Sequence, residues 1–171
     1  IWRELGRSPN RLAGIGFAAE GFDYSTGYVR KPGSFDPRAA FIFEGISADE
    51  IIGDFGSAGG GASGFEIDRA DVAYGTPPHA LLLASSEGHS DYYLLVLEDI
   101  ALNYPGLGGD ECDMVRADLV FFETPNGGAV FSTGSIAWAG SLAHNGYDNN
   151  VSRLTENVLR RFLDSAPFIE V

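Results

Sequence analysis

The chain has 171 residues, and its content of 44% hydrophobic and 12% aromatic residues is typical of a folded protein. Its 24 acidic and 11 basic residues give a formal net charge of −13, which argues against nucleic acid or an anionic membrane as a partner, because both require clustered Lys or Arg. No apolar run approaches the ~20 residues of a membrane-spanning helix, and the single Cys112 cannot close an intrachain disulfide. We therefore expect a cytoplasmic protein.

The first third of the chain predicts short elements separated by loops. Residues 12–17 form an apolar run that predicts a buried strand, with glycines that allow close backbone approach. Residues 21–32 are rich in Gly and Tyr and predict an ordered loop, because their aromatic side chains need burial. Residues 39–44 predict a second strand. The S-x-x-E spacing over residues 47–50 predicts a capping box that starts a short helix through residues 51 and 52.

Residues 56–64 are a run of Gly, Ala and Ser that predicts a loop whose backbone passes close to another segment. A short segment rich in ionisable side chains comes next. Residues 64–71 read GFEIDRAD, and in an extended strand Glu66 and Asp68 would share one face while Arg69 points to the other. Neighbouring carboxylates and an arginine can tune one another's pKa, which is how an enzyme gains an acid or a base. A solvated edge strand with an incidental ion pair accounts for the same pattern, so both interpretations stay open.

The other polar side chains predict no local metal site. Residues 80–85 and 92–98 predict two further strands, and His79 and His89 lie at opposite ends of the first one, so they are not expected to share a metal. Each histidine is interpreted as a hydrogen-bonded structural residue. The acidic loop at residues 103–113 lacks the spacing of an EF-hand and is interpreted as solvated.

The strongest local signals lie near the C-terminus. Two β-prone runs, residues 119–123 and 129–132, flank a Pro-Asn-Gly-Gly break and predict a hairpin. A helical turn is expected at residues 136–138. The polar residues 148–150 then offer a cap to an amphipathic helix that docks on a sheet. The cluster expected between hairpin and helix consists of Leu119, Phe121, Val130, Phe131, Val158 and Phe162.

Together these patterns predict an α/β fold of the α+β type, with short strands in a mixed sheet, a hairpin and a docked C-terminal helix. The 171 residues are expected to form a single domain or the C-terminal portion of a larger domain. Because the sequence starts at Ile1 without a methionine, we expect it to be a fragment of a longer polypeptide.

Two C-terminal segments, AVFSTGSIAW at residues 129–138 and HNGYDNNVSRLTENVLRRFLD at residues 144–164, resemble the large subunit of the bacterial N,N-dimethylformamidase family. The resemblance continues in WRELGR, GFD, DPRAA and GTPPHA upstream and covers most of the chain, although no single motif is an active-site signature. It implies that the chain forms the last elements of a glutamine-amidotransferase-like domain, at the end of a much longer polypeptide. Nothing in the chain resembles the Cys-His-Glu triad of amidotransferases, so the likeness implies no amidotransferase chemistry.

Members of this family hydrolyse N,N-dimethylformamide to formate and dimethylamine with a mononuclear iron bound by two tyrosines and a glutamate. The resemblance implies that these ligands lie upstream, so no metal ligand is assigned in this chain, Tyr24 and Tyr28 included. An iron-activated water would attack the carbonyl, and a nearby carboxylate would move protons. The family match places Glu66 in that catalytic role. Substrate-binding residues stay unassigned.

Three functions are compatible with the sequence. The chain contributes a pocket wall and one carboxylate to an amide hydrolase, or it is a non-catalytic structural or carbohydrate-binding module on the same scaffold, or it belongs to a relative that acts on a different amide. Trp2 and Trp138 are too few and too far apart for a sugar-stacking platform. The implied partners are the remainder of the large subunit, a small subunit, further copies in a homo-oligomer and a small amide. The chain alone is expected to be inactive and to hold no transition metal.

Overall fold

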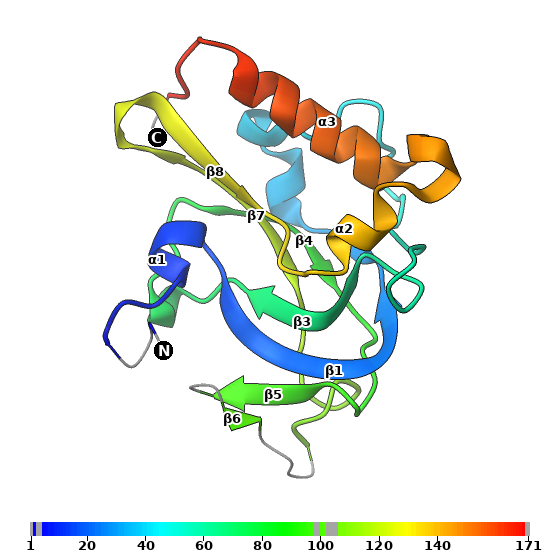
Figure 1. Cartoon of the computed structure of the whole chain (residues 1–171). Coiled ribbons are helices and arrows are strands. Elements are labelled where there is room, and N and C mark those ends of the chain that lie inside the picture. The colour runs from blue at the N-terminus through cyan, green and yellow to red at the C-terminus, as the bar shows by residue number, and fades with distance from the viewer. Residues whose placement is uncertain (1, 3–4, 98–99, 102–105, 170–171) are drawn as a thin grey trace.

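The computed structural model describes residues 2, 5–97, 100–101 and 106–169 (Figure 1). In these residues eight strands form two antiparallel sheets, with the strand orders β3-β1-β5-β6 and β2-β4-β7-β8. The strands are β1 (Gly16–Thr26), β2 (Tyr28–Arg30), β3 (Ser63–Arg69), β4 (Leu81–Ser86), β5 (Leu94–Leu97), β6 (Ile100–Ala101), β7 (Asp118–Thr124) and β8 (Gly128–Ser132). The α-helices are α1 (Asn10–Ala13), α2 (Trp138–Ser141) and α3 (Asn150–Leu163). Short 3-10 helices span Pro32–Phe35, Pro37–Ala39, Val72–Tyr74, Pro125–Gly127 and His144–Tyr147.

This arrangement confirms the predicted α+β character, with strands in sheets and few helices. The described strand pairs are all antiparallel. The first sheet occupies the lower half of the molecule, and α2 and α3 lie on the side of the second sheet (Figure 1). The amidotransferase-like domain stays a prediction, because it concerns a larger unit than this chain.

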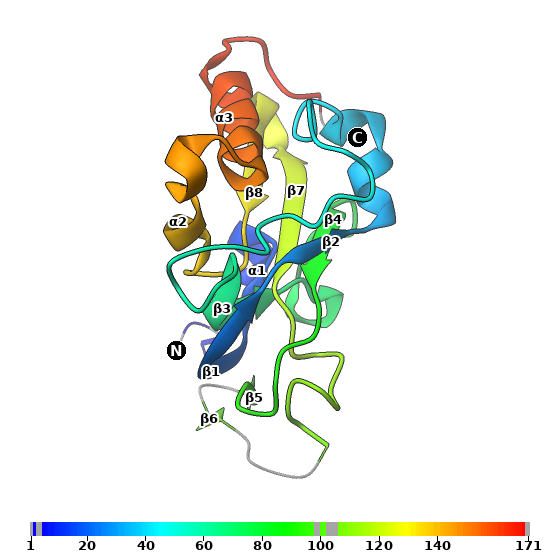
Figure 2. The same ribbon diagram turned by 90° about the vertical axis from the view of Figure 1, so that its right-hand side faces the viewer.

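The chain crosses from the first sheet to the second between β1 and β2, where Gly27 is the single intervening residue (Figure 2). A Cβ at Gly27 would lie 2.6 Å from Ile51 Cγ2, so the crossing needs glycine. The loop predicted over residues 21–32 is therefore wrong. Exposed Phe22 and Tyr24 alternate with buried Gly21 and Ser25, the period of a strand, which the frequent glycines obscured.

Three shorter predictions also need correction. The strand predicted at residues 12–17 begins only at Gly16, because residues 10–13 form α1, which Gly14 ends at a φ of 77°. Residues 39–44 form turns rather than a strand, in which Ile42 N donates to Ala39 O at 3.0 Å. The capping box forms in part, since Ser47 N donates to Glu50 Oε2 at 3.2 Å, but residues 51 and 52 form no helix.

The predicted hairpin and C-terminal helix are confirmed. Asn126 and Gly127 turn the β7–β8 hairpin with φ values of 72° and 83°. Asn149 caps α3, because its side chain accepts a hydrogen bond from Ser152 N at 2.9 Å. None of the helices that the structure describes has the length and apolarity to cross a membrane.

The predicted cluster between hairpin and helix is partly right. Leu119, Phe121 and Val158 are buried in the main core, and Phe131 packs against it. Val130 packs instead against a smaller cluster of Ile15, Val120 and Phe122, because neighbouring strand residues point to opposite faces. Phe162 is 39% exposed near the end of α3, where its ring centroid lies 5.4 Å from that of Phe168.

Candidate functional site

Glu66 stands on the exposed side of β3, and the predicted alternation of this strand is confirmed. Ile67 and Arg69 are buried, whereas Glu66 is exposed and Asp68 half-buried. Arg69 turns away from Glu66, since its Nη2 donates to Asp71 Oδ2 at 3.0 Å. The arginine expected to tune Glu66 thus stabilises the end of β3 instead.

A second carboxylate lies directly across from Glu66, and no local pattern predicts it. In the antiparallel pairing of β1 with β3, Glu20 and Glu66 are Cα partners, and on its other side Glu20 faces Leu94 of β5. Residues in this relation have Cβ atoms about 4.5–5.5 Å apart, and like charges there repel. Within the described part of the chain, neither carboxylate has a hydrogen bond or an ion pair.

Two aromatic rings lie next to this carboxylate pair. Phe22 follows Glu20 by two residues on the same face of β1 and is 85% exposed, with its ring centroid 6.0 Å from that of Phe65. Phe65 has a φ of 63°, a left-handed conformation that costs a non-glycine residue ~1 kcal/mol or more. The strand pairing shifts register at this point, and Tyr93 Oη accepts a hydrogen bond from Phe65 N at 3.2 Å. A strained but anchored backbone therefore positions Phe65 directly before Glu66.

The glycine-rich loop before β3 makes the close backbone approach that the sequence predicted. A Cβ at Gly64 would lie 1.9 Å from Ser25 Oγ, and one at Gly61 would lie 2.5 Å from Thr26 O. Ser135 also holds Gly64, because its Oγ donates to Gly64 O at 2.8 Å and accepts from Gly64 N at 2.9 Å. These contacts fix the start of β3 and hence the position of Glu66.

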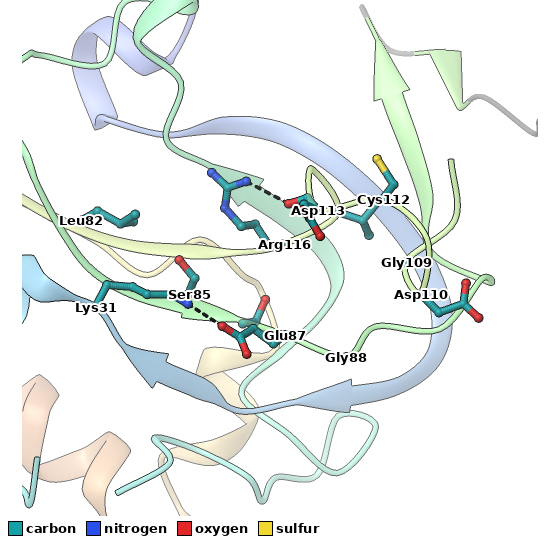
Figure 3. Close-up of a pocket in the computed structure, with 12 residues that line it drawn as sticks. Lys31, Leu82, Ser85, Glu87, Gly88, Gly109, Asp110, Cys112, Asp113 and Arg116 are labelled. Atoms are coloured by element: carbon teal, nitrogen blue, oxygen red, sulfur yellow. Dashed lines mark hydrogen bonds and ion pairs between the residues drawn. The ribbon is translucent and has the colours of Figure 1, made fainter. Parts of the chain in front are cut away.

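A separate cavity of about 580 Å³ lies beside the second sheet (Figure 3). Lys31 and Glu87 form an ion pair on its wall. Arg116, also on the wall, donates from Nη1 to Asp113 O at 2.9 Å and from Nε to Asp118 Oδ1 at 3.1 Å. Both cations are therefore engaged by acidic residues or carbonyls. Glu66 does not line this cavity, so the cavity and the carboxylate pair are distinct features.

His89, which follows β4, is fully buried. Ser86 Oγ accepts a hydrogen bond from Ala117 N at 2.7 Å and is hydrogen-bonded with His89 Nε2 at 2.8 Å. Burial lowers the pKa of His89 to about 4. His79 Nε2 lies 3.1 Å from Glu123 O at the other end of β4. Both histidines are hydrogen-bonded and far apart, as predicted.

In the described part of the acidic loop, residues 106–113, the acidic side chains are exposed, as expected, and approach one more carboxylate. Oxygens of Asp91, Asp110 and Glu111 lie within 4.8 Å of one another, and all three residues are exposed. The hydrogen bond with Asp110 raises the pKa of Asp91 above its usual range. The group consists of carboxylates only and lies at the solvated surface.

The tyrosines do not fit an iron site. Tyr28 is buried and donates from its hydroxyl to Thr133 O at 2.7 Å, and burial raises its pKa far above the usual range. Tyr24 donates to Gly88 O at 3.0 Å. A tyrosinate ligand must release its proton, whereas both hydroxyls here use theirs in hydrogen bonds to carbonyls. Tyr24 and Tyr28 therefore do not fit the two-tyrosine, one-glutamate set.

Comparison with known proteins identifies the family. The family model described as "N,N-dimethylformamidase beta subunit-like, C-terminal" matches residues 1–149, and the chain belongs to this family. Over 166 residues it is 50% identical to the N,N-dimethylformamidase beta subunit of Paracoccus aminophilus and 49% identical to that of Alcaligenes sp. Each match covers 97% of this chain and 22% of the relative. The chain thus spans about a fifth of the length of these relatives.

Proposed function

We propose that the chain is the C-terminal part of an enzyme that hydrolyses N,N-dimethylformamide or a closely related small amide. The observation that carries the proposal is the identity of about half of all matched residues with two proteins named N,N-dimethylformamidase beta subunit. In this reaction the oxygen of water bonds to the carbonyl carbon, the C–N bond breaks, and the nitrogen leaves as an amine after gaining a proton. The products from N,N-dimethylformamide are formate and dimethylamine.

Within this proposal, Glu66 moves the protons. Its carboxylate accepts a proton from the attacking water and later donates a proton to the departing nitrogen, which is general base and then general acid catalysis. Two observations support the role: Glu66 is exposed, and its strand is fixed by Ser135 and the glycine-rich loop. The competing interpretation of Glu66 as a residue of a solvated edge strand predicts no effect of its removal on catalysis.

The proposal also covers parts of the protein beyond this chain. The complete polypeptide binds iron through residues outside these 171, and this chain forms the C-terminal elements of its amidotransferase-like domain. It works with a small subunit in a homo-oligomer. The unpaired Cys112 is compatible with a reducing cytoplasm. Detection of the native protein outside the cytoplasm after cell fractionation would contradict that location.

The test is to purify the complete large subunit with its partner subunit, supply N,N-dimethylformamide, and measure formate and dimethylamine together with the metal content. We expect equal amounts of both products and about one tightly held iron per large subunit. The 171-residue chain alone should yield neither product nor stoichiometric iron. Absence of hydrolysis of every small amide tested by the complete iron-loaded protein would contradict the proposal. Hydrolysis of another small amide but not of N,N-dimethylformamide would favour a relative that acts on a different amide.

Trp138 is not available to a carbohydrate-binding platform. Trp138 is only 6% exposed, and its ring packs edge-on against Tyr28 at 5.8 Å between centroids. Its Nε1 donates to Thr155 Oγ1 at 3.1 Å, which fixes it in the core. A sugar-stacking platform requires exposed aromatic faces, and this ring offers none.

A further inference from the structure

We infer that the outer face of the first sheet is the surface on which the remainder of the same polypeptide docks, with a cationic group placed against Glu20 and Glu66. This inference rests on the proposed function in that it takes the chain to be one part of a longer hydrolase subunit. The outer face is defined by six residues of β1, β3 and β5. They are Glu20, Phe22, Tyr24, Phe65, Glu66 and Leu94.

The apolar content of this face is the first argument. Phe22 is 85% exposed and Tyr24 is 50% exposed, while the opposite face of the same strands is buried, with Ala19 and Ile67 at 0%. Covering an exposed Phe side chain is favourable, and the chain by itself does not gain this free energy. Adjacent exposed aromatics are typical of protein interfaces.

The carboxylate pair indicates the chemistry of the partner surface. Glu20 and Glu66 face each other across β1 and β3 with no counter-ion in the described residues. In water this repulsion is weak, but burying two unpaired carboxylates costs several kcal/mol each. A segment that covers Phe22 also covers these neighbours, and it must therefore bring a cationic group to them.

The backbone of Phe65 supports the same conclusion. Its φ of 63° is unfavourable for a side chain of this size, yet the ring lies beside Phe22 instead of in the core. The hydrogen bond from Phe65 N to Tyr93 Oη holds the conformation. An unfavourable backbone conformation thus places the Phe65 ring on the outer face. Contact with a docked segment would stabilise the ring in this position, whereas contact with water would not.

The relative lengths favour the same polypeptide as the occupant over a second copy of the chain. The matched relatives are several times longer than this chain, which covers 22% of each. A second copy would bring its own Glu20 and Glu66 against this pair, so four carboxylates would meet. Because the net charge of the chain is −13, a copy is a poor source of the cation that this face requires.

The test places a photoreactive residue on the outer face of the complete large subunit. Phe22→p-benzoylphenylalanine keeps an aromatic ring at an exposed position, so folding is preserved. Leu163 is matched in exposure, at 86% against 85%, and lies at the end of α3, so the same replacement there is the control. After irradiation, we expect the Phe22 variant to form cross-links within its own chain to residues outside these 171, at a yield well above that of the control.

Three outcomes would overturn the inference: cross-links from position 22 to a second copy, cross-links to the small subunit, or a yield no greater than that of the Leu163 variant. Glu66→Gln separates this inference from the proposed function. Intrachain cross-linking with normal activity of Glu66→Gln would keep the docking surface and reject the catalytic role. Absence of cross-linking with a large loss of activity in Glu66→Gln would reject the docking surface alone.

Discussion

The two sheets of this chain differ in what covers them. In the second sheet, Phe121 contributes to the main core on one side, and Val120 and Phe122 pack against Ile15 on the other. In the first sheet, one side is buried and the other presents Phe22 and Glu66 to solvent, with Glu20 half-buried between the neighbouring strands. The chain thus covers both sides of the second sheet at β7, whereas it leaves part of one side of the first sheet exposed.

The largest stability effect is expected in the second sheet. Phe121 is fully buried, and its ring packs edge-on against Phe41 at 5.6 Å between centroids. Phe121→Ala should lower the free energy of unfolding by ~3–5 kcal/mol, as aromatic truncations in cores do. The measurement is urea denaturation of the 171-residue chain. Phe22→Ala on the outer face is the control and should change the stability by less than ~1 kcal/mol; equal losses would remove the contrast between the sheets.

The next effect depends on pH and concerns His89. Its pKa is lowered to about 4 in the folded chain against ~6.5 unfolded, so the unfolded state binds the extra proton between these values. Its contribution to stability is therefore complete above pH ~6.5 and is lost as the pH falls towards 4, up to ~2–3 kcal/mol. Melting followed across this range should show the loss, and His89→Gln should flatten it. An unchanged acid slope in the variant would show that His89 is not the titrating group.

A smaller effect is expected at the start of α3. The Asn149 side chain accepts from Ser152 N and donates to Leu142 O at 3.0 Å, so Asn149→Ala should cost ~1 kcal/mol. Asn149→Asp retains the cap acceptor and should recover part of the loss. Thermal unfolding of the three proteins measures the difference, and a neutral Asn149→Ala would mean that packing alone fixes this helix start.

The smallest effect distinguishes the end of α3 from its middle. Phe162 is 39% exposed and contacts Phe168, so Phe162→Ala should cost ~1 kcal/mol or less rather than the loss of a core aromatic. Leu154→Ala, one fully buried position on the same helix, should cost ~2–5 kcal/mol in the same denaturation experiment. Similar losses at the two positions would place Phe162 in the core after all.

The parts of the fold that the sequence predicted correctly have local causes. The β7–β8 turn follows from Asn126 and Gly127, which adopt positive φ, and the start of α3 follows from the cap at Asn149. Both signals lie within a few residues of the structure they determine. The strand error at residues 39–44 has the opposite cause: Ile42 and Phe43 are apolar because they fill the core, not because they lie in a strand.

The candidate site was predictable only in part. Alternation along β3 correctly put Glu66 opposite Ile67, because it depends on one segment. The facing of Glu20 and Glu66 depends on the register between strands 46 residues apart in the chain, which no local pattern specifies. The pairing of Arg69 with Asp71 is local, but it depends on how the chain leaves β3, which alternation along the strand does not specify.

The central claim is that the carboxylate on the outer face of the first sheet performs chemistry, and one comparison in the complete enzyme tests it most directly. Glu66→Gln keeps the side-chain shape and removes the proton-transferring group, while Glu156→Gln removes an exposed carboxylate that pairs with Arg160 on α3. With iron content unchanged in both, kcat for N,N-dimethylformamide should fall by roughly 10²–10⁴ in Glu66→Gln and stay near normal in Glu156→Gln. Near-normal kcat in Glu66→Gln would contradict the account and leave Glu66 as a residue of a solvated strand.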